Sequence, residues 1–192
     1  ITLVGGSVNE LREGRDKLSN TSVVFDPDGD LVALYRKIHM FDVDVGGLVY
    51  RESEAQEPGD EIVTCEVEGW TVGLSICYDL RFPELYRRLA AAGAELLAVP
   101  SAFTLVTGKD HWEPLLRARA IENQCYVLAP AQHGRHDDQG LKESWGHAMI
   151  VDPWGQVVAC ASDGPGLALA PIERERIERI RRAMPVARHR RL

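Results

Sequence analysis

The sequence contains no long apolar run. No stretch approaches the roughly 18 to 20 apolar residues that a membrane-spanning helix needs, and the first residues lack the charged and then apolar segments of a secretion signal. Hydrophobic residues make up 45% of the 192 residues and charged residues 27%, a balance typical of globular proteins. We therefore expect a folded protein with no membrane partner.

Cysteine is scarce and shows no paired spacing. The four cysteines are far apart and form no CxxC motif: Cys65, Cys77, Cys125 and Cys160. This spacing indicates neither a zinc knuckle nor a disulfide framework, so a reducing compartment such as the cytoplasm fits best. Because they lie inside apolar strand patterns, we expect Cys65, Cys125 and Cys160 to pack in the core.

Positive charge is also in deficit. The net charge of −7 argues against a general nucleic-acid-binding protein, although a short basic tail closes the chain. Residues 1–192 show no repeat, low-complexity tract or interdomain linker. A chain of this length can bury one substantial hydrophobic core, so we predict a single domain.

Strand and helix patterns alternate along the chain, which predicts a layered α/β domain. The first half is expected to form a hairpin (21–25 and 31–35), an irregular stretch (46–60), two strands (62–67 and 70–76), a helix (83–92) and an apolar strand (95–99). The second half is expected to form a helix with Asp110 as N-cap, three strands (125–131, 146–151 and 156–161), a candidate strand (167–170) and a last helix (173–184).

The stretch SICYDLRFPELY places Cys77 at a corner between a predicted strand and a predicted helix. A nucleophile at such a corner is exposed at the sheet edge and faces the unpaired N–H groups of the new helix. The helix N-terminus contributes only about 0.3–1 kcal/mol, less than one pKa unit at about 1.36 kcal/mol. It cannot activate the thiol alone, and an inert core cysteine is an equal alternative on position.

A thiol that attacks a carbonyl also needs a proton acceptor and a group that stabilises the oxyanion. The segment YRKIHMFD supplies Arg36, Lys37 and His39 at the end of the second hairpin strand. Lys37 is a candidate electrostatic stabiliser, and His39 is a candidate base in a Cys-His pair. Strand periodicity places both side chains on one face, so the residues alone do not choose between them.

Several segments resemble the carbon-nitrogen hydrolase (nitrilase) superfamily, in that family's order and over almost the whole chain. They are YRKIHMFD, the pair Glu52-Ser53, GLSICYDLRFPELYRRLAAAGAELLAVPSAF, TGKDHWEPLLRARAIENQCYV and GHAMIVDPWGQVVA. Within the superfamily, HWEPLLRARAIENQCYVLAPAQHGRH, DGPGLALA and PVARHRR are most similar to the deaminated glutathione amidase branch.

The resemblance implies an αββα four-layer sandwich and a Glu-Lys-Cys triad that hydrolyses an amide through a thioester, with no metal or organic cofactor. Cys77 matches the nucleophile. Lys37 matches the triad lysine, which stabilises the oxyanion together with the backbone N–H of Tyr78. Glu52 matches a second glutamate, which orders the lysine and the substrate region.

The resemblance also implies a pocket rim formed by Arg81, Glu84, Phe103 and Thr104, for which helix capping and loop packing are an equal alternative. Glu113 lies in the family's HWE motif and is expected to reach the site. For Arg117, four residues later, we expect a surface ion pair with Glu113, which would itself belong to a capping box with Asp110.

The branch implies a small carboxylate-bearing amide substrate of the deaminated glutathione type, cleaved to carboxylate and ammonia. Action on α-ketoglutaramate, as an omega-amidase, is the neighbouring alternative. The family further implies a homodimer or a larger homo-oligomer, with the tail over 185–191 packed across subunits.

The general-base glutamate of the family lies ahead of the GGS strand with which this chain opens. Glu10 and Glu13 follow that strand and do not match the motif. We therefore expect an N-terminal portion to be missing from the sequence, including this glutamate and the first strand and helices of the sandwich. A catalytically silent fragment that acts as a binding or assembly module is the alternative from another class.

Overall fold

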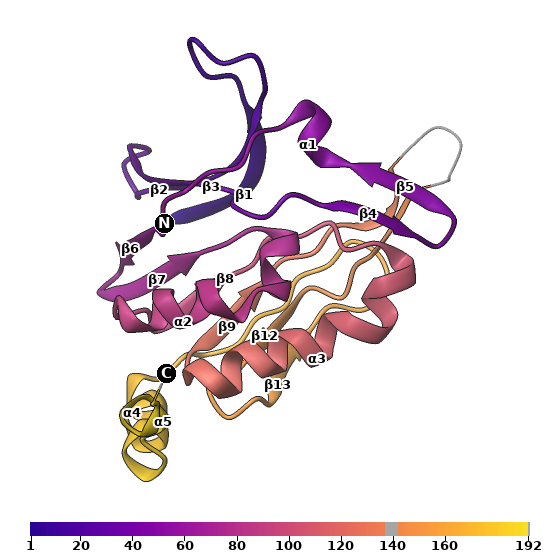
Figure 1. Cartoon of the computed structure of the whole chain (residues 1–192). Coiled ribbons are helices and arrows are strands. Elements are labelled where there is room, and N and C mark those ends of the chain that lie inside the picture. Colours follow the sequence, from indigo (N-terminus) through magenta and orange to yellow (C-terminus); the bar gives the residue numbers. More distant parts are fainter. Residues whose placement is uncertain (137–141, 192) are drawn as a thin grey trace.

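A six-stranded mixed sheet forms the centre of the protein (Figure 1). The computed structural model describes residues 1–136 and 142–191. The strand order is β13-β12-β9-β8-β7-β6, with β7, β8 and β9 parallel and the outer pairs antiparallel. The strands are β6 (Thr64–Val67), β7 (Trp70–Leu74), β8 (Leu96–Ala98), β9 (Tyr126–Ala129), β12 (Met149–Val151) and β13 (Val157–Cys160).

Helices α2 (Pro83–Ala91) and α3 (Leu105–Asn123) cover one face of this sheet (Figure 1). The second sheet is antiparallel and consists of β1 (Leu3–Glu10), β2 (Ser19–Phe25) and β3 (Leu31–Arg36). Val24 and Tyr35 of this sheet are fully buried in the same core as Leu97 of the central sheet. The helix and sheet layers agree with the predicted α/β sandwich.

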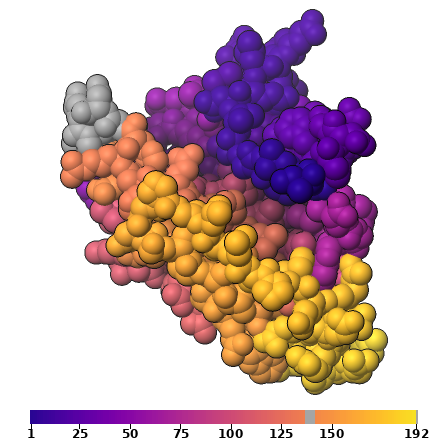
Figure 2. Space-filling view, turned by 180° about the vertical axis from the view of Figure 1, so that it is seen from behind, coloured from indigo at the N-terminus to yellow at the C-terminus, as the bar shows by residue number. Residues whose placement is uncertain are grey.

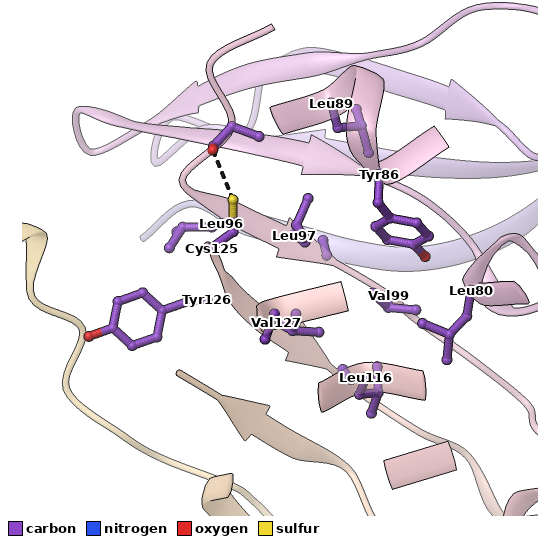
Figure 3. Close-up of a cluster of buried hydrophobic side chains, with 14 of the residues drawn as sticks. Leu80, Tyr86, Leu89, Leu96, Leu97, Val99, Leu116, Cys125, Tyr126 and Val127 are labelled. Carbon is purple, nitrogen blue, oxygen red and sulfur yellow. Dashed lines mark hydrogen bonds between the residues drawn. The ribbon is translucent and has the colours of Figure 1, made fainter. Parts of the chain in front are cut away.

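Close packing of α2 on β7 explains why this helix forms where the sequence predicts it. Pro83 occupies the first turn, where its missing N–H costs nothing, and Tyr86 and Leu89 are fully buried. A Cβ added to Gly73 of β7 would lie 3.1 Å from the Cβ of Leu89, so the glycine permits this approach. Figure 3 shows Tyr86 and Leu89 converging on Leu97 of the wholly buried strand β8.

The expectation of an irregular stretch over 46–60 was wrong for residues 48–55, whereas residues 57–60 lie in no helix or strand. Strand β5 (Leu48–Arg51) forms a hairpin with β4 (Asp42–Val45), which lies just upstream, and is followed by the short helix α1 (Glu52–Ala55). Gly46 and Gly47 have φ of 61° and 78°, the left-handed values that a two-residue hairpin turn requires. The hairpin matters because β5 carries the chain directly to Glu52.

Helix α3 begins earlier than predicted. Its N-cap is Thr104, whose hydroxyl accepts a hydrogen bond from the amide of Thr107 at 3.4 Å, so Asp110 is not the cap. The first turn packs against β11 (Glu143–Trp145), which pairs with β10 (His133–Arg135). A Cβ on Gly108 would lie 2.2 Å from the Cβ of Trp145. This tertiary contact extends the helix upstream of the local capping signal.

The three cysteines with expected core roles differ in burial. Cys125 is buried, its thiol donates to the carbonyl of Ala94 at 3.1 Å (dashed in Figure 3), and burial raises its pKa to about 11. Cys65 is half-buried. Cys160 is exposed, so the core prediction was wrong there, because β13 is an edge strand whose outer side faces solvent.

The C-terminal helices α4 (Arg174–Ala183) and α5 (Val186–His189) lie at one end of the molecule, and the N-terminal strands lie at the other (Figure 2). Ile177 and Ile180 form the buried stripe of α4, as predicted. The candidate strand over 167–170 does not form in the described structure. No helix in the described part of the chain has the length and apolar character to cross a membrane.

Candidate active site

Cys77 occupies a sharp corner at the end of β7. It is the first residue of the 3-10 turn η1 (Cys77–Arg81), which leads into α2. Its φ of +49° lies in the left-handed region, where a non-glycine residue is strained and often functional. The amide of Cys77 donates to the carbonyl of Pro100 at 2.9 Å, which fixes the corner to the segment that follows β8. The predicted strand-to-helix elbow is confirmed.

The corner opens into a cavity of about 760 Å³. Cys77 shares its lining with Lys37, which follows β3, and with Glu52 at the start of α1. The two sheets and the β4–β5 hairpin therefore bring three segments of the chain to one place. The lining also includes four further residues that the sequence predicts at the pocket: Tyr78, Arg81, Phe103 and Thr104.

Lys37 and Glu52 form the central ion pair of the cavity. The lysine side chain is only 2% exposed, and its Nζ lies 2.5 Å from Glu52 Oε2. The same carboxylate oxygen accepts a hydrogen bond from the amide of Phe41 at 2.6 Å, and Oε1 accepts one from the Asn20 side chain at 3.4 Å. These bonds hold Glu52 in place, and Glu52 holds the ammonium.

Two opposing influences act on the thiol of Cys77. Burial raises its pKa above the ordinary value, and this is the largest effect. The ammonium of Lys37 and the backbone amide of Ala102 lower it, while the carboxylates of Glu52 and Asp79 raise it. Lys37 is therefore the side chain of the site that favours the thiolate.

The rim of the cavity combines a guanidinium with aromatic rings. The Arg81 guanidinium lies 5.2 Å from the ring centroid of Phe103 and 5.8 Å from that of Tyr78, within the range of cation–π attraction. It also contacts His111 Nδ1 at 3.3 Å. Thr104 caps α3 beside them, so it has the capping role that the sequence offered as an alternative.

The hypothesis that Glu113 reaches the site was wrong. Its side chain is half-exposed, is absent from the described lining of the cavity, and pairs with Arg117 at 3.3 Å. The two residues are four apart on α3 and therefore share one helix face, and their exposed side chains show that this face is the solvent side. The predicted ion pair of Arg117 is confirmed.

His39 lies outside the cavity lining as well. Strand β3 ends at Arg36, so the alternation that would place His39 beside Lys37 does not continue. The His39 ring instead bonds Asp79 Oδ1 through Nδ1 at 2.7 Å. Of the two residues that the sequence left open as partners of Cys77, Lys37 lines the cavity with Cys77 and His39 does not.

Asp79 is a site residue that the sequence reasoning missed. Its side chain is fully buried and accepts four hydrogen bonds. The available signal was an acidic residue two positions after the candidate nucleophile, directly behind an apolar strand. A buried carboxylate at that position requires donors close by, and they come from Ile76 beside Cys77 and from Tyr35 and His39 on either side of Lys37.

A family model for carbon-nitrogen hydrolases matches residues 1–182. The chain belongs to the carbon-nitrogen hydrolase family. This assignment confirms the resemblance read from the motifs around Lys37, Glu52 and Cys77.

Relatives and solved structures agree with this family. The chain is 51% identical over 181 residues to the deaminated glutathione amidase of Mus musculus, which covers 93% of this chain and 55% of that protein. It is 46% identical over 192 residues to omega-amidase NIT2 of Homo sapiens, with 100% and 68% covered. The C. elegans NitFhit structure matches with a TM-score of 0.93 at 44% identity, over 100% of this chain and 47% of that one.

The structural match confirms that the protein has the predicted sandwich fold of the nitrilase type. This carbon-nitrogen hydrolase chain spans little more than half the length of the mouse relative.

Proposed function

We propose that this carbon-nitrogen hydrolase is a thiol amidase that cleaves the terminal amide of a small carboxylate-bearing substrate of the deaminated glutathione type. The observation that carries the proposal is the shared cavity of Cys77, Lys37 and Glu52. A thiol beside a buried ammonium suits a reaction in which negative charge develops on a carbonyl oxygen. The similarity to the mouse deaminated glutathione amidase supports the same reaction class.

The proposed reaction has two halves. The sulfur of Cys77 adds to the amide carbon, and the ammonium of Lys37 and the backbone N–H of Tyr78 stabilise the oxyanion. The proton of the thiol passes to the amide nitrogen, which leaves as ammonia when the thioester forms. Water then hydrolyses the thioester to release the carboxylate and restore the thiol. Glu52, at the start of α1, binds Nζ of Lys37 and so holds the ammonium at the cavity.

Two substrates are candidates for this cavity. The guanidinium of Arg81, held over Phe103, is suited to bind a substrate carboxylate. The similarity to human omega-amidase NIT2 over the whole chain favours α-ketoglutaramate as the second candidate. Pocket contacts that differ by one methylene discriminate by only about 1–3 kcal/mol, so both substrates belong in one assay.

The test is ammonia release from deaminated glutathione and from α-ketoglutaramate by the full chain. Cys77→Ala is expected to lower kcat about a thousandfold or more, because it removes the attacking atom. Cys160→Ala is the matched control, since Cys160 is exposed on β13, and it should keep the wild-type rate. Equal rates for wild type and Cys77→Ala would refute the proposal. An inactive wild type would instead support a silent binding module.

The assembly and setting of the enzyme are part of the proposal. We propose that residues 1–192 fold as one domain and that the protein forms a homodimer or larger homo-oligomer. The exposed apolar side chains of Ile121, Trp154 and Val158 support self-association. Four free cysteines support a reducing, cytoplasmic setting. Light scattering after size exclusion would test the oligomer, and a mass equal to one chain would contradict it.

A further inference from the structure

The buried carboxylate of Asp79 connects the two segments that carry the proposed nucleophile and the proposed oxyanion stabiliser. Its side chain is 0% exposed. We propose that Asp79 is a positioning residue that sets the place of Lys37 relative to Cys77 by binding both segments at once. The inference deepens the proposed amidase function and rests on it.

One oxygen of Asp79 binds the nucleophile segment. The amide of Ile76, the residue before Cys77, donates to Asp79 Oδ2 at 2.9 Å. The amide of Asp79 in turn donates to the carbonyl of Ile76 at 3.0 Å. This reciprocal pair closes the elbow around Cys77, whose backbone has the strained positive φ. Without such bonds, the strained corner would relax.

The remaining bonds of Asp79 reach the lysine segment. Tyr35 donates its hydroxyl to Oδ2 at 2.7 Å, and His39 donates its backbone amide to Oδ1 at 3.1 Å. These two residues lie two positions before and two positions after Lys37. The backbone that carries the lysine is thus fixed on both sides, while its side chain extends into the cavity.

His39 strengthens the same connection. Its ring bonds Asp79 Oδ1 at 2.7 Å and stacks on Phe82 with centroids 3.7 Å apart and an interplanar angle of 5°. Phe82 follows the turn η1, so the stack joins the lysine segment to the far end of the elbow. His39 therefore acts through position, outside the cavity where the reaction would occur.

The chemistry of the donors suits a permanent connection. Hydrogen bonds to an ionised acceptor are roughly twice as strong as neutral ones. Burial and the charge of Asp79 raise the pKa of Tyr35 far above its usual range, so its hydroxyl stays a donor at every pH at which an enzyme works. A displacement of about 1 Å at a reacting group can cost about a hundredfold in rate.

A pair of tyrosine variants separates positioning from general stability. Tyr35→Phe removes one bond to Asp79 and leaves the ring. Tyr86→Phe is the matched control: Tyr86 is equally buried, but its hydroxyl lies 2.9 Å from Ser75 Oγ and does not reach the lysine segment. We expect Tyr35→Phe to lower kcat/KM about tenfold and Asp79→Asn about a hundredfold. Tyr86→Phe should keep the wild-type kcat/KM, even if its melting temperature falls as much as that of Tyr35→Phe.

Alkylation of Cys77 by iodoacetamide gives a readout that a purely structural role would not move. A displaced Lys37 no longer favours the thiolate, so Tyr35→Phe and Asp79→Asn should react more slowly than wild type at pH 8. Faster alkylation of Asp79→Asn would show that Asp79 acts only through its charge, and it would overturn the inference. Equal activities of Tyr35→Phe and Tyr86→Phe would also overturn it. Activity that survives Cys77→Ala would instead overturn the proposed function itself.

Discussion

Glu52 Oε2 lies 2.5 Å from Lys37 Nζ. Both residues line the cavity, one from the segment after β3 and the other from the start of α1. The lysine is almost fully buried, and a buried ammonium without a partner is costly. The carboxylate compensates for that cost and is itself anchored by the amide of Phe41. Because Glu52 follows β5 directly, the position of the ammonium depends on the β4–β5 hairpin.

Replacing Glu52 by glutamine should impair both activity and stability. The substitution keeps the shape but leaves the ammonium of Lys37 without its counter-charge in a buried place. We expect kcat/KM for ammonia release to fall about 10- to 100-fold and the melting temperature to fall with it. Glu113→Gln is the control, since the exposed pair with Arg117 contributes little. Indistinguishable kinetics for the two variants would contradict a role for Glu52.

The reactivity of Cys77 should depend on Lys37. Burial raises the pKa of the thiol and the lysine lowers it, so Lys37→Gln leaves the raising effects unopposed by that charge. The pKa moves further up, the thiolate fraction at pH 8 falls, and alkylation by iodoacetamide slows. The measurement is the alkylation rate from pH 7 to 10, followed by mass spectrometry of the Cys77 peptide. A profile for Lys37→Gln that superposes on wild type would show that the ammonium does not act on the thiol.

Local patterns predicted those parts of the fold that local forces determine. Helix α2 and strand β8 lie where the sequence places them, because Pro83 and a continuous apolar run are strong signals in themselves. The start of α3 was misplaced because its first turn is stabilised by contact with Trp145, which is remote in sequence. Similarly, the hairpin before Glu52 depends on a turn of two glycines with positive φ. A pattern of apolar residues does not reveal such a turn.

The site divides in the same way. Cys77 could be located from its corner, but the residue pattern by itself did not separate Lys37 from His39. The end of β3 and the partner of each side chain separate the two residues in the structure. Asp79 was not predicted, because its role depends on four hydrogen bonds from two separate segments. Sequence spacing does not show that these segments lie side by side. Resemblance to the family supplied the lysine and Glu52, while geometry supplied the carboxylate that connects their surroundings.

Stability in acid should depend on Glu10. Its hydrogen bonds and charge interaction with Arg36 lower the carboxyl pKa from 4.5 to about 2. A carboxyl with a lowered pKa in the folded protein contributes stability that is present above pH 4.5 and is lost as the pH falls toward 2. Allowing for partial exposure, we expect this contribution to be about 1–3 kcal/mol.

Calorimetry from pH 6 to 3 should show a shallower decline in stability for Glu10→Gln than for wild type. Glu13→Gln, an exposed neighbour, should follow wild type, and an unchanged slope in Glu10→Gln would contradict the assignment.

Gly59 sits against the backbone that carries Lys37, which makes it a sensitive point far from the reacting atoms in sequence. Its amide donates to the carbonyl of Lys37 at 2.8 Å, and an added Cβ would lie 2.4 Å from the carbonyl oxygen of Arg36. A backbone atom cannot avoid the new methyl group by changing rotamer, as a side chain could. Gly59→Ala must therefore displace the segment that carries Lys37. We expect a loss of about 1–3 kcal/mol in stability and a clear fall in kcat/KM. Gly166→Ala is the control, because its new methyl group would meet only Ala161, at 3.7 Å. Wild-type kinetics and melting temperature in Gly59→Ala would contradict the claim that activity depends on the position of the segment that carries Lys37.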